Sequence, residues 1–244
     1  MIQVLSPARK WWRELVLALF AYALPALATA EVPTKISASY DLLKNGQHVG
    51  VIQEQFERTG DSYSIVSETR LLGVLGLVPA GRMKVTSRGA VAARGLRPAH
   101  FEQARGTDTA RDTSATFDWS NGSITLQHGG TVETLPLPAG TQDRLSVMYQ
   151  FMFLQLARLP ALEFPMTNGS KVDLYRYDVH RGQSVATPAA RFNGVHLVKQ
   201  RTPEQTGTEI WLAEQRNFFP VRVVNQETNG DRLEQILTRL EFTP

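Results

Sequence analysis

The chain has 244 residues, with 26 lysines and arginines, 23 aspartates and glutamates, and no cysteine. The absence of cysteine excludes a disulfide scaffold and a lipidated cysteine, so burial alone must stabilise the fold. The formal net charge of +3 and the isoelectric point of about 9.3 are, taken alone, compatible with a nucleic-acid partner.

The first 30 residues have the three-part order of a secretory signal peptide. Three basic residues between positions 9 and 13 precede an apolar stretch from Leu15 to Leu27, and small residues end the segment at Ala30. The apolar stretch is short for a bilayer and is interrupted by Pro25. We therefore expect export by the general secretory route, cleavage after Ala30, and a periplasmic product that is not an integral membrane protein.

Removal of this segment changes the charge balance. It takes away three basic residues and one acidic residue, which leaves 23 basic and 22 acidic residues in 31–244, a net charge of +1. Nucleic-acid binding requires a clustered basic face rather than a basic leader, so we expect no nucleic-acid partner. The remaining chain shows no linker or change of composition, and we expect one domain over residues 31–244.

Short segments of alternating or β-branched residues, separated by turn residues, follow from Ile36 onward. The clearest turn is Asn45-Gly46, whose residue types suit the positive φ angles of a tight hairpin. Asn121-Gly122, Gly129-Gly130 and Asn229-Gly230 indicate further turns. The predicted strands are Ile36–Leu43, Val49–Arg58, Tyr63–Leu72, Arg82–Val91, His100–Arg105, Ser114–Trp119, Ser123–Gln127, Thr131–Leu135, Lys171–His180, Ser184–Pro188, Arg191–Lys199, Thr208–Ala213, Val221–Glu227 and Arg232–Phe242.

One helix is predicted, over Asp143–Leu159, where glycine and proline are absent and Thr141 or Asp143 can cap the start. Its apolar side chains cover most of the helix circumference, which indicates burial on several sides. About a dozen strands with one such helix favour a mainly β fold. We expect a single antiparallel sheet, barrel-like or strongly curved, with the buried apolar helix covering an open end or the concave face.

No residues are predicted to be catalytic, cofactor-binding or metal-binding, and no cofactor is expected. The five histidines lack ligand spacing. Asp173, Asp178 and His180 come nearest to a ligand cluster, and Asp178 and His180 would share a strand face, but a solvated strand end is the preferred interpretation. Paired carboxylates such as Asp41 and Glu54 could face each other across the first hairpin, a weak signal for glycoside hydrolysis. Ser146 lies inside the predicted helix, without the Gly-x-Ser-x-Gly turn of a nucleophile.

A glycine-interrupted apolar segment from Leu71 to Gly81 is the first candidate binding feature. Its side chains Val74, Leu75, Leu77 and Val78 would contact an apolar ligand or a partner if the segment forms a loop at the sheet rim. The alternative is that these side chains fold into the core beside the helix.

A basic strand face is the second candidate. Arg82, Lys84 and Arg88 share strand parity and would meet an anionic lipid headgroup, a cell-wall polymer or an acidic partner. The alternative is an ordinary solvated face.

Several short motifs come in an order that resembles the exported bacterial family called domain of unknown function 3108. The resemblance spans roughly Ile36 to Phe242 and implies a periplasmic or surface-associated β-barrel-like domain, with no activity or site residue to carry over. The motifs are Tyr40-Asp41, Asn45-Gly46, Gly50, Gly140-Thr141-Gln142-Asp143-Arg144-Leu145-Ser146, Trp211-Leu212-Ala213 and Phe219-Pro220-Val221-Arg222.

The expected function is non-enzymatic. The protein would bind an apolar or amphipathic envelope component, such as a lipid or glycan, or a protein partner, in a concavity bordered by the helix and the 71–81 segment. Two alternatives stay open: a hydrolase or lyase acting on an envelope polymer, with strand-borne carboxylates and histidines, and a structural assembly factor.

Overall fold

The structure is a computed structural model that describes residues 33–72, 79–106 and 108–243. Within this part the chain forms one 15-stranded sheet. The strands are β1 (Lys35–Lys44), β2 (Gln47–Thr59), β3 (Ser62–Leu72), β4 (Pro79–Ala92), β5 (Gly95–Ala104), β6 (Thr113–Asp118), β7 (Ser123–His128), β8 (Thr131–Pro136), β9 (Gln142–Asp143), β10 (Ala161–Thr167), β11 (Val172–Ala186), β12 (Arg191–Lys199), β13 (Gly207–Ala213), β14 (Phe219–Gln226) and β15 (Arg232–Thr243). The short helices are η2 (Thr109–Arg111), α1 (Ser146–Gln150), η3 (Phe151–Phe153), η4 (Leu156–Arg158) and η5 (Glu214–Arg216).

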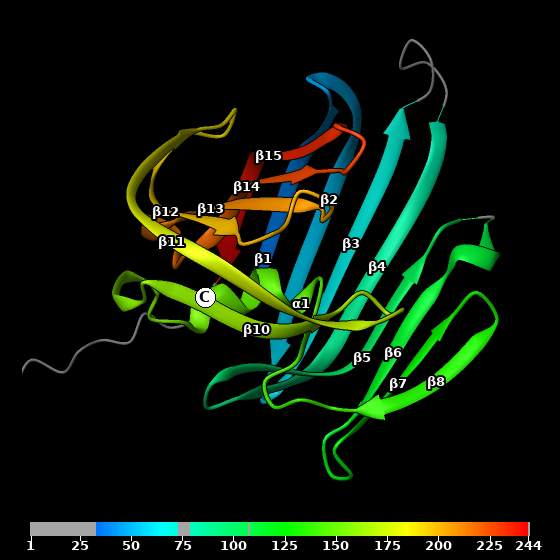
Figure 1. Ribbon diagram of the computed structural model, residues 1–244. Coiled ribbons are helices and arrows are strands. Elements are labelled where there is room, and N and C mark those ends of the chain that lie inside the picture. Colours follow the sequence, from blue (N-terminus) through cyan, green and yellow to red (C-terminus); the bar gives the residue numbers. More distant parts are fainter. Residues whose placement is uncertain (1–32, 73–78, 107, 244) are drawn as a thin grey trace, which may run out of the picture.

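The sheet consists of two wings that meet at the two ends of the described chain. Strand order runs from β8 through β1 and then from β15 back to β9, so β1 pairs with β15 in the middle of the sheet. All pairs are antiparallel except β9 with β10. In Figure 1 the two wings curl toward each other, with α1 between them. The prediction of a mainly β, strongly curved sheet is confirmed, but the sheet is open because β8 and β9 are its edges.

Alternating side chains explain the curl. Along β1, Ile36, Ala38 and Tyr40 are buried on the concave face, while their neighbours are more exposed. Such alternation over successive strands makes one face apolar, and the sheet buries that face by curving over the segment that contains α1. The buried apolar residues form two clusters, and α1 contributes to both: Tyr149 to the first and Val147 to the second.

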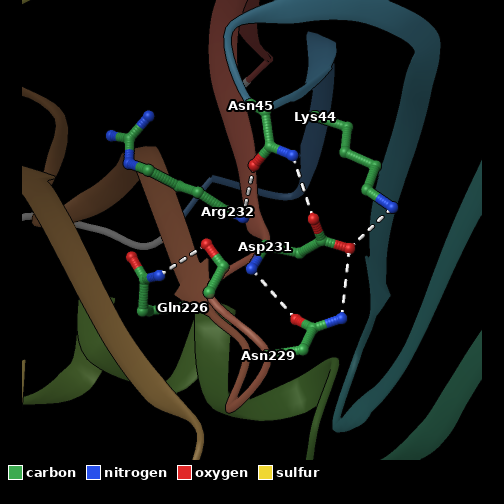
Figure 2. Close-up of polar contacts among 7 residues, drawn as sticks. Lys44, Asn45, Gln226, Asn229, Asp231 and Arg232 are labelled. Atoms are coloured by element: carbon green, nitrogen blue, oxygen red, sulfur yellow. Dashed lines mark hydrogen bonds and ion pairs between the residues drawn. The ribbon is translucent and has the colours of Figure 1, made fainter.

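The turns at the junction of the wings are joined by polar contacts (Figure 2). Asn45 and Gly46 have φ angles of 52° and 81°, which confirms the predicted hairpin. The backbone N–H of Asn45 donates to Arg232 O at 2.8 Å, and the Arg232 N–H donates to the side-chain oxygen of Asn45 at 2.8 Å. Asp231 accepts from Asn45 at 2.9 Å and pairs with Lys44 at 2.7 Å. These contacts link β1–β2 to β14–β15.

The predicted helix over Asp143–Leu159 is wrong in length, because α1 has only five residues. Asp143 instead belongs to β9, opposite Thr167, and after η3 the backbone becomes extended at Leu154. An apolar stretch without one distinct helical face does not require a continuous helix, so tertiary packing determines the backbone conformation of residues 143–159. The broken path lets the chain supply side chains to both apolar clusters.

Three strand predictions also differ from the structure. β10 was not predicted because it contains Pro165; the strand tolerates this proline because its other neighbour, β9, is only two residues long. The segments predicted at 171–180 and 184–188 form one strand, β11, with a bulge between His180 and Gln183. β5 begins at Gly95, earlier than predicted. Among the described residues, no helix is long and apolar enough to cross a membrane.

Candidate functional site

The segment from Gly140 to Gln150 crosses the concave face and fastens the second wing to β5 of the first. Gln142 Nε2 donates to Leu96 O at 2.8 Å, and the Leu96 N–H donates to Gln150 Oε1 at 2.6 Å. Gln150 Nε2 also donates to Arg94 O at 2.8 Å. A Cβ atom at Gly95 would lie 2.3 Å from Gln150 Oε1, so glycine is required for this approach. Side chains, rather than a strand ladder, therefore connect the two wings here.

Asp143 organises the start of α1 from a fully buried position. Its Oδ1 accepts the N–H groups of Leu145 at 2.9 Å and Ser146 at 2.7 Å, and Ser146 Oγ accepts the Asp143 N–H at 3.0 Å. These reciprocal hydrogen bonds between Asp143 and Ser146 have the pattern of a capping box. Ser87 of β4 donates to Oδ2 at 2.6 Å. Burial raises the pKa of Asp143, and these hydrogen bonds act in the opposite direction.

Glu54 of β2 is the second acidic group of this region. It accepts hydrogen bonds from Ser67 Oγ at 2.9 Å and from the Tyr149 hydroxyl at 3.1 Å. Burial raises the pKa of Glu54, which favours its uncharged form, while both hydrogen bonds and the charge of Arg144 act in the opposite direction. The Tyr149 ring stacks on Phe56 with 5.3 Å between centroids, which fixes the hydroxyl toward Glu54.

Arg144 extends from the crossing segment toward the end of β5. Its guanidinium donates to Gln103 Oε1 at 2.7 Å. Burial lowers the pKa of Arg144, and the nearby charge of Arg105 lowers it further. None of the ion pairs among the described residues includes either arginine. Arg144 also forms no salt bridge with its neighbour Asp143, because the Asp143 carboxylate accepts from Ser87 and from the N–H groups at the helix start.

A cavity of about 740 Å³, here called the polar cavity, lies on one side of the crossing segment. Its aliphatic and methionine side chains come from both wings and from the crossing segment: Ile52, Met83, Val85, Leu145, Met148, Met166, Val223 and Leu233. The remaining lining is polar, charged or tyrosine: Glu54, Ser67, Thr69, Arg105, Arg144, Asn168, Lys171, Asp173, Tyr175, Tyr177, Lys199, Glu204, Gln205, Thr206, Thr208, Asn225, Glu227 and Gln235. The cavity thus brings an apolar floor together with many hydrogen-bonding groups.

A second cavity of about 360 Å³, here called the apolar pocket, lies against other side chains of the same segment. The Trp119 ring is fixed by a hydrogen bond from Nε1 to Pro98 O at 2.6 Å, and the Arg97 guanidinium lies 5.0 Å from the ring centroid. The remaining lining is Ala92, Arg94, Gly95, Leu96, Gly140, Gln142, Val147, Gln150, Phe151, Leu154, Leu162, Glu163 and Phe164. Its walls are mainly aliphatic and aromatic, with two arginines and one glutamate.

The predicted contact residues Val74, Leu75, Leu77 and Val78 lie outside the described residues. Leu72, which precedes them, ends β3 and is partly buried. This part of the sequence prediction therefore has no structural counterpart here.

The predicted basic face lies on the convex side of β4. Arg82, Lys84 and Arg88 are exposed, while the alternating Val85 and Ser87 are buried on the concave side. The expected strand parity is thus correct. Lys84 lies 3.8 Å from Glu68, as in an ordinary solvated strand pair. These cations line neither the polar cavity nor the apolar pocket, whereas Lys84 and Arg88 line a separate hollow of about 460 Å³ on this face.

The carboxylates and histidines considered in the sequence do not come together in one site. Asp41 lies opposite Val51 and within 3.4 Å of His48, whereas Glu54 lies opposite Ala38 and lines the polar cavity, so the two carboxylates do not face each other. The part of the chain that the structure describes holds no group of three His, Asp or Glu side chains arranged for a metal. His180 contacts the ring of His196.

No sequence pattern indicates that Glu54, Gln103 and Tyr149 belong to one network. Each lies in a different part of the sequence, and only the sheet order brings them together. One signal was present: Gly140–Ser146 is a polar run directly before an apolar stretch. Ser146 Oγ donates to Gln142 Oε1 at 2.9 Å and makes no arrangement of a nucleophile with a base.

Comparisons with known proteins agree with this architecture. The family model described as "Protein of unknown function (DUF3108)" matches residues 35–238. No curated protein matches the chain. Among solved structures, a beta-barrel-like protein of domain of unknown function DUF1849 from Brucella abortus is similar, with a TM-score of 0.54, 12% identity, and coverage of 87% of this chain and 99% of that chain. At this identity the likeness concerns the fold alone.

Proposed function

The chain belongs to the DUF3108 family, and from that premise we propose that it is an exported, periplasmic binding protein that takes up an apolar or amphipathic envelope component. The observation that carries this proposal is the apolar pocket. Its aromatic and aliphatic walls, with few polar groups, have the composition typical of small-molecule sites. Arg94 and Arg97 provide positive charge for the anionic end of an amphipathic ligand.

The signal-like segment over residues 1–30 supports the cellular part of the proposal. A periplasmic protein meets lipids and their fragments, whose apolar parts gain free energy when a pocket removes them from water, about 25 cal/mol for each Å² buried. The pocket lies between β5 of one wing and β10 of the other. Small movements of the wings would therefore change access to it.

A hydrolase or lyase is the second candidate, and the specific observation in its favour is Glu54. A carboxyl group with a raised pKa that lines a cavity resembles a general acid. The other acidic group of the region, Asp143, is fully buried, already accepts three hydrogen bonds and lines neither cavity, so it is not placed to reach a substrate. The binding function therefore accounts for more of the structure.

A fluorescent fatty-acid titration tests the binding function. A dansyl-labelled fatty acid should accept energy from Trp119, and Trp119→Phe should remove most of this transfer, whereas Trp211→Phe should remove less, because Trp119 lines the pocket and Trp211 does not. Leu154→Asp, which places a charge in the pocket, should weaken binding at least about tenfold. The matched control is Leu174→Asp at an exposed site of β11. Equal binding by these two aspartate variants would contradict the proposal.

A further inference from the structure

We infer that the polar cavity is a second binding site, which takes an acidic saccharide and holds its carboxylate or phosphate group with Arg144 and Arg105. The inference does not depend on the apolar pocket, because the two cavities use different side chains of the crossing segment. Arg144, Leu145 and Met148 line the polar cavity, whereas Val147 and Gln150 line the apolar pocket.

The two arginines are the first part of the argument. Arg144 uses one donor for Gln103, and a guanidinium carries five N–H groups, so donors remain for a ligand. Partial burial and the neighbouring Arg105 disfavour the charge of Arg144, and the carboxylates of Asp143 and Glu54 offset only part of this cost. Among the ion pairs of the described residues, none satisfies Arg144 or Arg105. A bound carboxylate or phosphate would accept bidentate hydrogen bonds from such a group.

The acidic residues near the arginines leave this anion position available. Asp143 already accepts three hydrogen bonds and lines neither cavity. Burial raises the pKa of Glu54, which reduces its negative charge. Asp173 pairs with Lys171 at 2.6 Å, and Glu204 is exposed in the loop between β12 and β13.

The rest of the cavity points to a saccharide rather than a lipid. Only eight of the 26 lining side chains are aliphatic or methionine. Hydroxyl and amide groups line the β11–β15 side, with Thr208 Oγ1 and Asn225 Oδ1 at 3.1 Å from each other. Such groups exchange hydrogen bonds with sugar hydroxyls, while the apolar floor formed by Met148 and Met166 suits the C–H face of a sugar ring.

Calorimetric titration of the protein lacking residues 1–30 tests the inference with three probes: trigalacturonic acid, the neutral maltotriose, and dodecyl phosphate. Trigalacturonic acid should bind at least about tenfold more tightly than maltotriose, because only the acid engages the arginines. Equal binding of both saccharides would overturn the arginine assignment. Binding of dodecyl phosphate without binding of the acidic saccharide would overturn the saccharide assignment. Absence of binding by every probe would overturn the site.

Three variants connect the binding to the cavity. Arg144→Gln and Arg105→Gln should each weaken binding of the acidic saccharide at least about tenfold, with thermal unfolding curves showing that the variants are folded. Arg105→Gln serves as the independent readout if Arg144→Gln is unfolded. The matched control Arg88→Gln removes a charge from the convex face and should leave binding unchanged; a loss there would overturn the inference in favour of the outer face. Leu154→Asp should not affect saccharide binding, which separates this result from failure of the fatty-acid site.

Discussion

Replacement of Asp143 by alanine is the most informative test of how the crossing segment is held. The change removes three hydrogen bonds and leaves two buried N–H groups and the Ser87 hydroxyl without this acceptor. Each buried unsatisfied polar group costs about 1–3 kcal/mol, and Ser87 can still bond to Tyr63 at 3.0 Å. The alanine variant also avoids the free-energy cost of burying a carboxyl group, which offsets part of this loss. We therefore expect a loss of about 3–5 kcal/mol in the free energy of unfolding.

Urea denaturation at pH 7, followed by both fluorescence and circular dichroism, measures this loss. Asp143→Asn keeps an oxygen for the N–H groups of Leu145 and Ser146 and should cost only about 1–2 kcal/mol. Ser87→Ala should cost about 1 kcal/mol. The reasoning is refuted if the alanine variant lies within about 1 kcal/mol of the wild type, or if asparagine and alanine are equally destabilising.

The other predictions concern charge, backbone and packing. Burial raises the pKa of Glu54 in the folded state above its ordinary value of 4.5, so the stabilisation from this carboxyl is lost as pH rises from 4.5 through the folded pKa. Glu54→Gln does not titrate, so in urea titrations it should gain stability relative to the wild type over that pH range. A stability difference that stays constant with pH would contradict this. Gly95→Ala combines a φ of +109° with contact to Gln150 and should cost about 2 kcal/mol or more in thermal unfolding, clearly more than Gly130→Ala in open space. Phe56→Ala should cost about 3–5 kcal/mol by chemical denaturation, and a cost near that of a surface change would show that the first apolar cluster is not tightly packed.

Local signals predicted most of the fold. Alternation of side chains located nearly all strands, and Asn45-Gly46 set the first turn because its residue types tolerate positive φ angles. β10 escaped prediction because Pro165 is compatible only with a strand that lacks a full neighbour on one side, a fact of sheet order rather than of sequence. The predicted helix is too long because the apolar stretch has no single helical face, and its side chains divide between two clusters, with Met152 in the first and Phe151 and Leu156 in the second.

The candidate site was far less predictable. Glu54, Gln103 and Arg144 come from two strands of one wing and from the crossing segment, and their spacing in sequence carries no periodic signal. The reciprocal bonds of Asp143 and Ser146 are local, and Asp143 was expected to cap the helix. The hydrogen-bond partner of Arg144, Gln103, lies 41 residues away in sequence, so no local pattern indicates it.

The central pairing of β1 with β15 sets the order in which this protein can fold. Every other pair in the sheet joins strands that are consecutive in sequence, so each wing can grow by adding one hairpin after another. The pairing of Lys35 with Thr243 must instead bring together opposite ends of the chain, which makes it the contact with the largest loop-closure entropy. A circularly permuted chain, with its ends joined and reopened at the turn between β6 and β7, would make the β1–β15 pair a local hairpin and would transfer the long-range closure to β6 and β7.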